Sequence, residues 1–250
     1  MAILNYYKPL GWTPLECIEE IKRQRPEYTD SPMTYTGRLD PMAEGVIVFL
    51  TDEDRFKKPD FQKLNKTYEA TILFGLSSDT YDSLGLLESG GVTTEEHIKA
   101  SVEQLQGEHL LPFPPYSSYK IQGKPLHWWA REGRLNEIDI PMKHMTVLNT
   151  PVATVSSRTL RDIREHVLRR INLVRGDFRQ EETQRSWETI DTQEQQLLIA
   201  TVTLEVTSGT YIRSLAHLLG QELGCGALLL ELRRTAVGTY HQKNSERFDV

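Results

Sequence analysis

The sequence predicts an α+β fold in which a mixed, mostly antiparallel sheet is flanked by helices. Strand and helix patterns follow one another without the regular strand–helix–strand rhythm of a doubly wound parallel sheet. The clearest strand pattern, at 198–206, has apolar residues at every second position. Two threonine-led capping boxes mark the starts of helices. With 250 residues, 38% hydrophobic and 26% charged, the chain can form one large core, and we expect a single domain spanning 1–250.

The N-terminal segment predicts a strand followed by a helix. Residues 3–7 form a short apolar strand that ends at a Lys-Pro-Leu-Gly turn. Thr13 and Glu16 can each satisfy a free backbone N–H at the start of the helix, which Pro26 ends. The expected apolar face of this helix comprises Leu15, Ile18 and Ile21.

Two strands and a second helix are expected next. Residues 46–50 are uniformly apolar, which is typical of a strand buried on both faces. Residues 68–74 alternate between apolar and polar, and Gly75 ends that strand. A second capping box at 93–96 begins a helix. Its expected apolar face comprises Ile98, Val102 and Leu105.

The middle of the chain is rich in proline and aromatic residues. Residues 111–116 contain three prolines and are expected to be extended. Pro125 begins a short helix that contains Trp128 and Trp129, whose rings we expect to pack in the core or against loops. Residues 145–148 are a further strand candidate.

The C-terminal part predicts a helix and two short strands. The helix runs from about Tyr211 to Leu223 and is ended by Gly224. One strand is expected at 228–232, and a last short strand near Val237. Between 156 and 195 lies an arginine-rich segment that looks like a helical insertion at a turn between two strands. Its apolar residues at helical spacing are Leu160, Ile163, Val167 and Ile171.

Composition and motif searches exclude several function classes. The net charge of −6 argues against a generic, charge-driven nucleic-acid binder, although a local basic groove remains compatible with it. No apolar stretch is long enough to span a membrane, and two cysteines far apart in sequence provide no disulfide framework, which favours a cytoplasmic protein. The glycine motifs of dinucleotide and phosphate loops are absent, as is the histidine spacing of a zinc enzyme.

Two segments contain candidate chemistry. Asp40 directly precedes Pro41 between two glycines, which places a carboxylate on a rigid loop before a buried strand. Arg213 lies just inside the C-terminal helix that follows Ser208-Gly209-Thr210. Taken singly, the aspartate is typical of a turn or helix cap, and the arginine of a surface ion pair.

Taken together and in order, these segments resemble the TruB family of tRNA pseudouridine synthases. The resemblance covers most of the chain outside 156–195. The matching segments are Lys8-Pro9-Leu10-Gly11, Thr36-Gly37-Arg38-Leu39-Asp40-Pro41, Lys66-Thr67-Tyr68-Glu69-Ala70, Ser78-Asp79-Thr80-Tyr81-Asp82, Pro115-Tyr116-Ser117-Ser118-Tyr119-Lys120, Ala130-Arg131-Glu132-Gly133, Ser208-Gly209-Thr210-Tyr211-Ile212-Arg213 and Leu232-Arg233-Arg234.

The resemblance implies a pseudouridine synthase fold and assigns site residues. It places the catalytic aspartate at Asp40, the active-site tyrosine at Tyr68 and the arginine that pairs with the aspartate at Arg213. An adjacent guanidinium favours the ionised carboxylate, which the reaction requires of a nucleophile or base. The residues that it implies for substrate binding are Tyr35, Tyr211, Leu232 and Lys8.

The implied activity is isomerisation of uridine to pseudouridine in the T arm of tRNA, at uridine 55. The reaction needs no cofactor and no metal, and the expected partner is tRNA, with no membrane and no obligate protein partner, acting as a monomer in the cytoplasm. A non-catalytic tRNA-binding chaperone is the alternative, since both proteins would bind tRNA but only the enzyme needs Asp40. A scaffold in a ribonucleoprotein particle is the third and weakest interpretation.

Three features depart from the family pattern. Tyr35 stands where the family usually has histidine, so a stacking ring remains but no imidazole. The RNA-binding PUA domain of many relatives is not expected after the final strand. The arginine-rich segment has no family counterpart, and it could be either a solvated helical hairpin or an arm that contacts tRNA.

Overall fold

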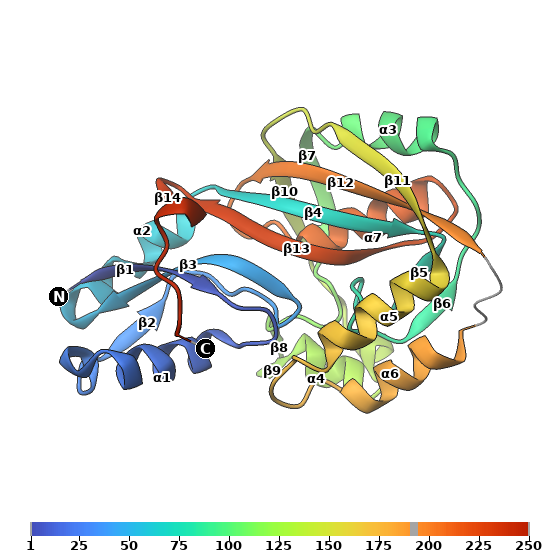
Figure 1. The fold of residues 1–250 in the computed structure, drawn as a ribbon. Helices are drawn as coiled ribbons and strands as arrows, with labels where there is room; N and C mark the ends of the chain where they lie inside the picture. The colour runs from blue at the N-terminus through green and yellow to red at the C-terminus, as the bar shows by residue number, and fades with distance from the viewer. Residues whose placement is uncertain (1, 191–194, 250) are drawn as a thin grey trace.

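The computed structural model describes residues 2–190 and 195–249 and is built around one ten-stranded sheet (Figure 1). Seven strands follow one another across it, and β2, β11 and β14 pair with β3, β12 and β13 at its margins. In spatial order the seven are β1 (Ile3–Lys8), β3 (Ala43–Thr51), β13 (Ala227–Val237), β4 (Lys66–Phe74), β12 (Gln196–Val206), β10 (Met142–Val147) and β7 (Gly107–Pro112).

The strand directions confirm the expected mostly antiparallel sheet. Among the named strands of the described residues, β3 and β13 are the parallel pair, with Leu232 opposite Ala43. The marginal strands are β2 (Met33–Tyr35), β11 (Ala153–Thr159) and β14 (Tyr240–His241). Two small hairpin sheets comprise β5 (Leu76–Ser78) with β6 (Leu87–Ser89), and β8 (Lys120–Ile121) with β9 (Lys124–Pro125).

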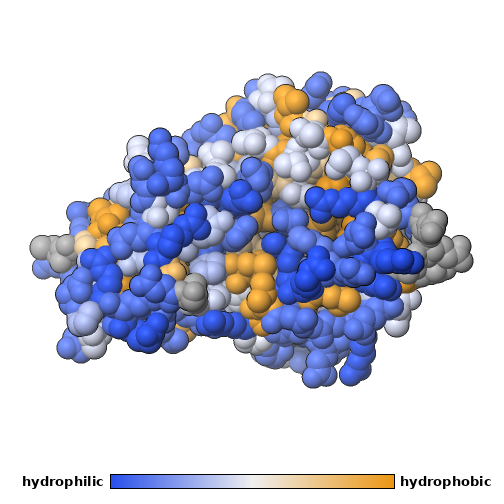
Figure 2. Space-filling model, in the orientation of Figure 1, coloured by the Kyte–Doolittle hydropathy of each residue, from blue (hydrophilic) through white to orange (hydrophobic). Residues whose placement is uncertain are grey.

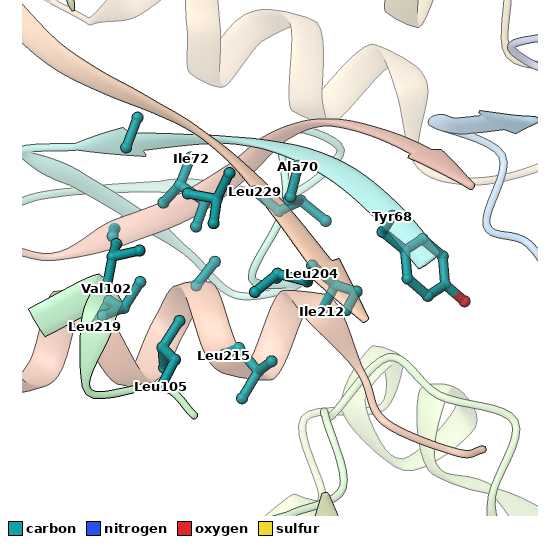
Figure 3. Packing of buried hydrophobic residues seen from close by; sticks show 14 of the residues in the cluster. Tyr68, Ala70, Ile72, Val102, Leu105, Leu204, Ile212, Leu215, Leu219 and Leu229 are labelled. Atoms are coloured by element: carbon teal, nitrogen blue, oxygen red, sulfur yellow. The ribbon is translucent and has the colours of Figure 1, made fainter. Parts of the chain in front are cut away.

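Helices cover both faces of the sheet, as two adjacent residues of β4 show, because their side chains point to opposite sides. Ile72 packs with helices α3 (Glu95–Glu103) and α7 (Ile212–Glu222) on one face, where Figure 3 shows it among Val102, Leu215 and Leu219. Leu73 packs on the other face with α5 (Leu160–Ile171) and α6 (Gln180–Thr189). On the surface in Figure 2, apolar residues form scattered patches among hydrophilic ones. No helix of the described residues is long and apolar enough to cross a membrane.

The arginine-rich segment forms part of this second face. Helices α5 and α6 connect β11 to β12, two strands that pair with each other from Ala153–Val202 to Thr159–Gln196. The four residues at helical spacing, Leu160, Ile163, Val167 and Ile171, are all buried against the sheet, together with Trp187 of α6. Residues 160–190 are therefore a two-helix layer with a packed inner face and an exposed, charged outer face, whereas residues 156–159 of the predicted insertion belong to β11 and residues 191–194 lie outside the described residues.

Helix α1 (Pro14–Gln24) has the expected capping box, in which Thr13 and Glu16 hydrogen-bond reciprocally. The prediction that Leu15 belongs to its apolar face was wrong. Leu15 is 60% exposed, whereas Cys17 is fully buried together with Ile18 and Ile21. Residue 17 falls on the inward stripe of the helix, and position 15 lies at its margin.

Three other expectations need correction. The second helix is capped by Thr94, whose hydroxyl accepts from the His97 amide, so the box does not begin at residue 93. The extended segment starts earlier than expected, as β7 at Gly107, and its strand pairing ends at Pro112. The two C-terminal strands are one continuous strand, β13, which absorbs register shifts after Leu229 and after Arg234 instead of breaking.

The remaining helices are short. Helix α4 (Leu126–Arg131) begins after Pro125 as expected, and it buries Trp129. Trp128 lies edge-to-face on Trp129, with 5.1 Å between ring centroids. The Lys124 ammonium makes a cation–π contact with the Trp128 ring, 3.4 Å from its centroid. Helix α2 (Lys58–Lys63) follows a 3-10 turn that begins at Asp52.

Candidate active site

Asp40 lies on the loop between β2 and β3, and two backbone hydrogen bonds fix the loop around it. The carbonyl of Asp40 accepts from the Ala43 amide at 3.0 Å, which starts β3 directly after the loop. The carbonyl of Pro41 accepts from the Gly11 amide at 2.8 Å. The carboxylate is therefore presented from a short, doubly anchored turn.

Arg234, on β13, hydrogen-bonds to the backbone of the same loop and of β3. Its guanidinium is almost fully buried, and it donates to the carbonyls of Val46 at 2.7 Å, Arg38 at 3.0 Å and Gly37 at 3.3 Å. Sequence reasoning matched Arg234 to a family motif without giving it a role. The available signal was a charged side chain on the inward-facing register of an apolar strand, where burial requires partners.

β3 and β13 approach so closely beside Arg234 that only glycine fits. Gly45 has a φ of +115°, and a Cβ there would lie 2.2 Å from the carbonyl oxygen of Arg234. This contact explains a glycine inside an otherwise apolar strand pattern.

Arg213 extends from the first turn of α7 to two carboxylates. Its Nε lies 2.9 Å from Oδ2 of Asp40 and 3.7 Å from Oδ2 of Asp82. Nε makes no aligned hydrogen bond within the described residues, so both contacts are ion pairs. Nη1 donates to the carbonyl of Thr80 at 3.0 Å and Nη2 to that of Tyr116 at 3.4 Å, which fixes the plane of the guanidinium.

The three charged groups differ sharply in burial. The side chains of Arg213 and Asp82 are 7% and 10% exposed, whereas that of Asp40 is 44% exposed. Burial raises the pKa of Asp82, and the nearby Arg213 offsets only part of that increase. Burial by itself lowers the pKa of Arg213, but Asp40 and Asp82 outweigh it, so the pKa is raised and the guanidinium stays charged.

Asp82 also belongs to the candidate site. It stands in one of the motifs that match the family, but the sequence alone assigned it no role. Its Oδ1 accepts from the Thr80 hydroxyl at 2.7 Å and from the Leu84 amide at 3.0 Å. Its other oxygen, Oδ2, lies 3.7 Å from Nε of Arg213, so Asp82 is a second carboxylate against the atom that pairs with Asp40.

A cavity of about 10 Å³, enough for about one water molecule, separates these groups from the sheet. Asp40, Arg213, Asp82 and Leu232 line it together, so the fold brings three of the residues inferred from sequence or resemblance to one place. A larger cavity of about 320 Å³ is lined by Asp79, Tyr81 and His217, among others. The rings of Tyr81 and His217 are stacked, with 3.8 Å between their centroids.

Tyr68 lies at the open end of the core cluster. On β4 it is paired with Leu204 on one side and with Arg234 on the other, and it is 8% exposed. Its ring belongs to the same cluster as Leu39 and Leu232, next to the Asp40 loop. Figure 3 shows the ring at the end of the cluster, with its hydroxyl directed away from Ala70 and Ile72.

Tyr211 is the N-cap of α7, two residues before Arg213. Its ring meets that of Phe113 edge-to-face, with 5.8 Å between centroids, and burial raises its pKa. Tyr211 is therefore held beside Arg213 by α7 and by the segment after β7.

Lys8 and Tyr35 occupy different surroundings. The ammonium of Lys8 is fully buried and donates to the carbonyls of Trp12 at 2.7 Å and Pro9 at 3.0 Å, and burial lowers its pKa to about 8. Tyr35 packs at the edge of the separate cluster under α1, with the Lys58 ammonium 5.2 Å from its ring centroid. The structure thus places Lys8 in the wall behind the loop and Tyr35 at the end of β2, apart from the cavity.

The arrangement suits acid–base or nucleophilic chemistry by a single carboxylate. A partly exposed Asp40, held on a fixed turn against a permanently charged arginine, is available to an incoming group while remaining oriented. Among the described residues, no cluster of three or more histidine, cysteine, aspartate or glutamate side chains could hold a metal ion.

Two protein-family models match the chain. Residues 27–178 match the N-terminal domain of TruB family pseudouridylate synthase, and residues 213–248 match the C-terminal domain of tRNA pseudouridylate synthase B. The first match includes Asp40, Tyr68 and Asp82, and the second begins at Arg213.

Curated relatives match along nearly the whole chain. A protein named tRNA pseudouridine synthase B from Nitratidesulfovibrio vulgaris is 32% identical over 238 residues, which are 94% of this chain and 62% of the relative. One of the same name from Dehalococcoides mccartyi is 32% identical over 251 residues, 99% of this chain and 68% of the relative. The chain spans less than two thirds of the first relative's length.

Solved structures share the fold. A chain in the crystal structure of a Cbf5-Nop10-Gar1 complex superposes with a TM-score of 0.59 at 19% identity, over 98% of this chain and 51% of that one. A chain of an H/ACA RNP bound to a substrate RNA containing 2′-deoxyuridine gives 0.55 at 18% identity, over 98% and 50%. These neighbours confirm the expected α+β fold.

Proposed function

This chain belongs to the TruB family of pseudouridylate synthases, and we propose on that basis that it isomerises uridine to pseudouridine in the T arm of tRNA, at uridine 55. The observation that carries the proposal is the ion pair between Asp40 and Arg213, 2.9 Å apart at the mouth of the small cavity. A folding chaperone would need a tRNA-binding surface but not this half-exposed carboxylate with its buried counter-charge.

The reaction is a rearrangement whose atoms balance without a co-reactant. The bond between C1′ of the ribose and N1 of uracil breaks, the base turns, and a bond between C1′ and C5 forms. The proton on C5 is lost, and N1 gains one. No electrons leave the substrate, so an acid–base site can complete the reaction.

Asp40 is the residue that we assign to the chemistry. Its carboxylate either attacks the substrate or removes a proton at the ribose 2′ position, and both roles require the ionised form. Arg213 supplies a positive charge that stays in place because Thr80, Tyr116 and Asp82 hold it. The cavity itself is too small for a pyrimidine, so the flipped base would lie on the exposed side of Asp40.

The surrounding residues would hold the extruded uridine. Tyr68 offers a ring face at the open end of the core, and Leu232 contributes an apolar wall under Asp40. Tyr211 closes the side nearest Arg213. Lys8 and Tyr35 would act from further away, Lys8 by bracing the turn at Pro9–Trp12 and Tyr35 by contacting RNA beyond the flipped base.

We further propose that the protein acts as a cytoplasmic monomer on tRNA alone, without an obligate protein partner. In this proposal the described residues belong to one catalytic domain, with α5 and α6 as an insertion in it. The outer face of that pair carries several exposed arginines, which favours a contribution to tRNA binding.

A single assay tests the function. Tritium release from tRNA labelled at uridine C5 should occur with the protein alone, and mapping should place the modified base at position 55 of the T arm. Tight tRNA binding without tritium release would support the chaperone instead. Release from a different position would retain the enzyme and reject the assigned target.

A further inference from the structure

Arg179 is the N-cap of α6 and has a strained backbone conformation. Its φ of +60° and ψ of +35° lie in the left-handed region, which non-glycine residues rarely adopt. Such strain persists where surrounding contacts over-determine the conformation. The side chain of Arg179 is only 14% exposed, although the residue caps a surface helix, and its contacts can hold the backbone in this conformation.

The Arg179 guanidinium holds two neighbouring groups. Its Nη2 donates to Oδ2 of Asp79 at 2.9 Å, and its Cζ lies 4.3 Å from the centroid of the Tyr116 ring. The other oxygen of Asp79 accepts from the Leu86 amide at 2.8 Å, which ties the carboxylate to its own loop. Burial, followed by the negative charge of Asp79, raises the pKa of Tyr116 to about 12.

These two groups lead directly to the candidate active site. The carbonyls that accept from Arg213 belong to Thr80, the residue after Asp79, and to Tyr116 itself. The two loops that orient Arg213 are therefore joined to each other by Arg179. Other α6 contacts hold the same region: the Trp187 indole donates to the Ser83 carbonyl at 3.0 Å.

We propose that Arg179 is a positioning residue, which keeps Arg213 aligned on Asp40 by clamping the Asp79–Thr80 turn to Tyr116. This assigns the helical segment between β11 and β12 a role in the chemical step, separate from any contact with tRNA. The proposal rests on the proposed function for its kinetic consequences but not for its structural ones.

The test variant is Arg179→Gly, because glycine adopts the left-handed conformation without strain and the variant should therefore fold. Single-turnover rates with C5-tritiated tRNA should fall by about 10- to 100-fold, the loss expected from a small displacement of a catalytic group. The reaction amplitude and the tRNA affinity should not change, whereas partial unfolding would lower the amplitude. Arg179→Lys should recover part of the rate, since an ammonium can still reach Asp79.

Hydrogen exchange tests the clamp without any activity. The Leu86 amide should exchange faster in Arg179→Gly than in the parent protein, because its acceptor Asp79 loses its second partner. The matched control is Arg23→Gln on α1, which also removes one positive charge from a side chain that is 68% exposed, and it should change neither the rate nor the exchange of the Leu86 amide.

Two results would overturn the proposal. One is a parental rate and parental Leu86 protection in Arg179→Gly. The other is a loss confined to tRNA affinity, which would make Arg179 an RNA contact. If the parent protein releases no tritium, the proposed function fails, while the exchange experiment still decides whether Arg179 clamps the turn.

Discussion

Arg213 and Asp40 form an ion pair in which the cation is buried and the anion is not. Their side chains are 7% and 44% exposed, and 2.9 Å separates Nε from Oδ2. A buried charge is held in one orientation, whereas a half-exposed carboxylate can still meet a ligand. The pair thus combines a fixed positive charge with an accessible carboxylate, and the first two predictions test the two residues separately.

Asp40→Asn should abolish isomerisation and leave tRNA affinity within a few-fold of the parent value. The amide keeps the shape of the side chain but can neither attack nor accept a proton. Tritium release and filter binding on the same preparation provide the two measurements. Turnover at even a tenth of the parental rate would remove Asp40 from the mechanism.

Arg213→Met should lose most activity and also destabilise the fold. It leaves Asp82 buried without its counter-charge, and breaking a buried ion pair costs about 3–5 kcal/mol. Urea unfolding should show this decrease in the free energy of unfolding at neutral pH. The double variant Arg213→Met/Asp82→Asn should regain stability but not activity. Equal free energies of unfolding for the single and the double variant would contradict the ion pair between Arg213 and Asp82.

Tyr68 should act mainly through its ring face. Stacking of a base on an aromatic ring contributes about 1–3 kcal/mol, so Tyr68→Leu should weaken productive binding of the flipped uridine by that amount. Tyr68→Phe keeps the ring, and a loss of about 10²–10⁴ in its single-turnover rate would show that the hydroxyl takes part in proton removal. Parental rates in Tyr68→Leu would mean that no ring is needed at this position.

The outer face of α5 should contribute to tRNA binding through its arginines. Deleting the segment is a poor test because α5 buries Leu160 and Val167 in the core, so charge variants are preferable. Changing the exposed Arg161 and Arg169 to glutamine, singly and together, should raise KM and flatten the dependence of log K on log salt by about 0.7–0.9 per lost phosphate contact.

The control for this charge series is Arg23→Gln on α1, which removes one positive charge, as each single α5 variant does, from a side chain that is 68% exposed. If the single α5 variants and the control share the same salt slope, the outer face of α5 is simply solvated.

Stability should increase with pH between about 8 and 9. Burial lowers the pKa of Lys8 and of Lys66 from 10.5 to about 8, so above pH 8 the unfolded chain binds more protons than the folded one. Above pH 9 the increase should become shallower, because burial raises the pKa of Cys17 to about 12, and opposing the ionisation of this one thiol offsets part of the effect of the two lysines. Urea midpoints between pH 7 and 10 test this, and Lys8→Met should reduce the slope between 8 and 9.

Local patterns in the sequence were sufficient for most elements of the fold. The alternation at 68–74 and 198–206, the box at Thr13 and the helical spacing in α5 each depend on contacts within a few residues of chain. Errors arose where a longer-range contact decides the outcome. Strand β13 continues past the expected break because it pairs with β4 almost throughout, and Leu15 is exposed because the sheet lies under Cys17 instead.

The candidate site divides in the same way. Asp40, Tyr68 and Arg213 could be named as candidates, because each stands in one of the ordered motifs that resemble the TruB family. The residues that hold them could not: Arg234 reaches the carbonyls of Gly37 and Arg38 from a distant strand, and Arg179 reaches the turn before Thr80 from α6. Their partners are backbone groups or side chains far away in sequence, so no local spacing records them, and only the packed sheet with its two helical layers brings them together.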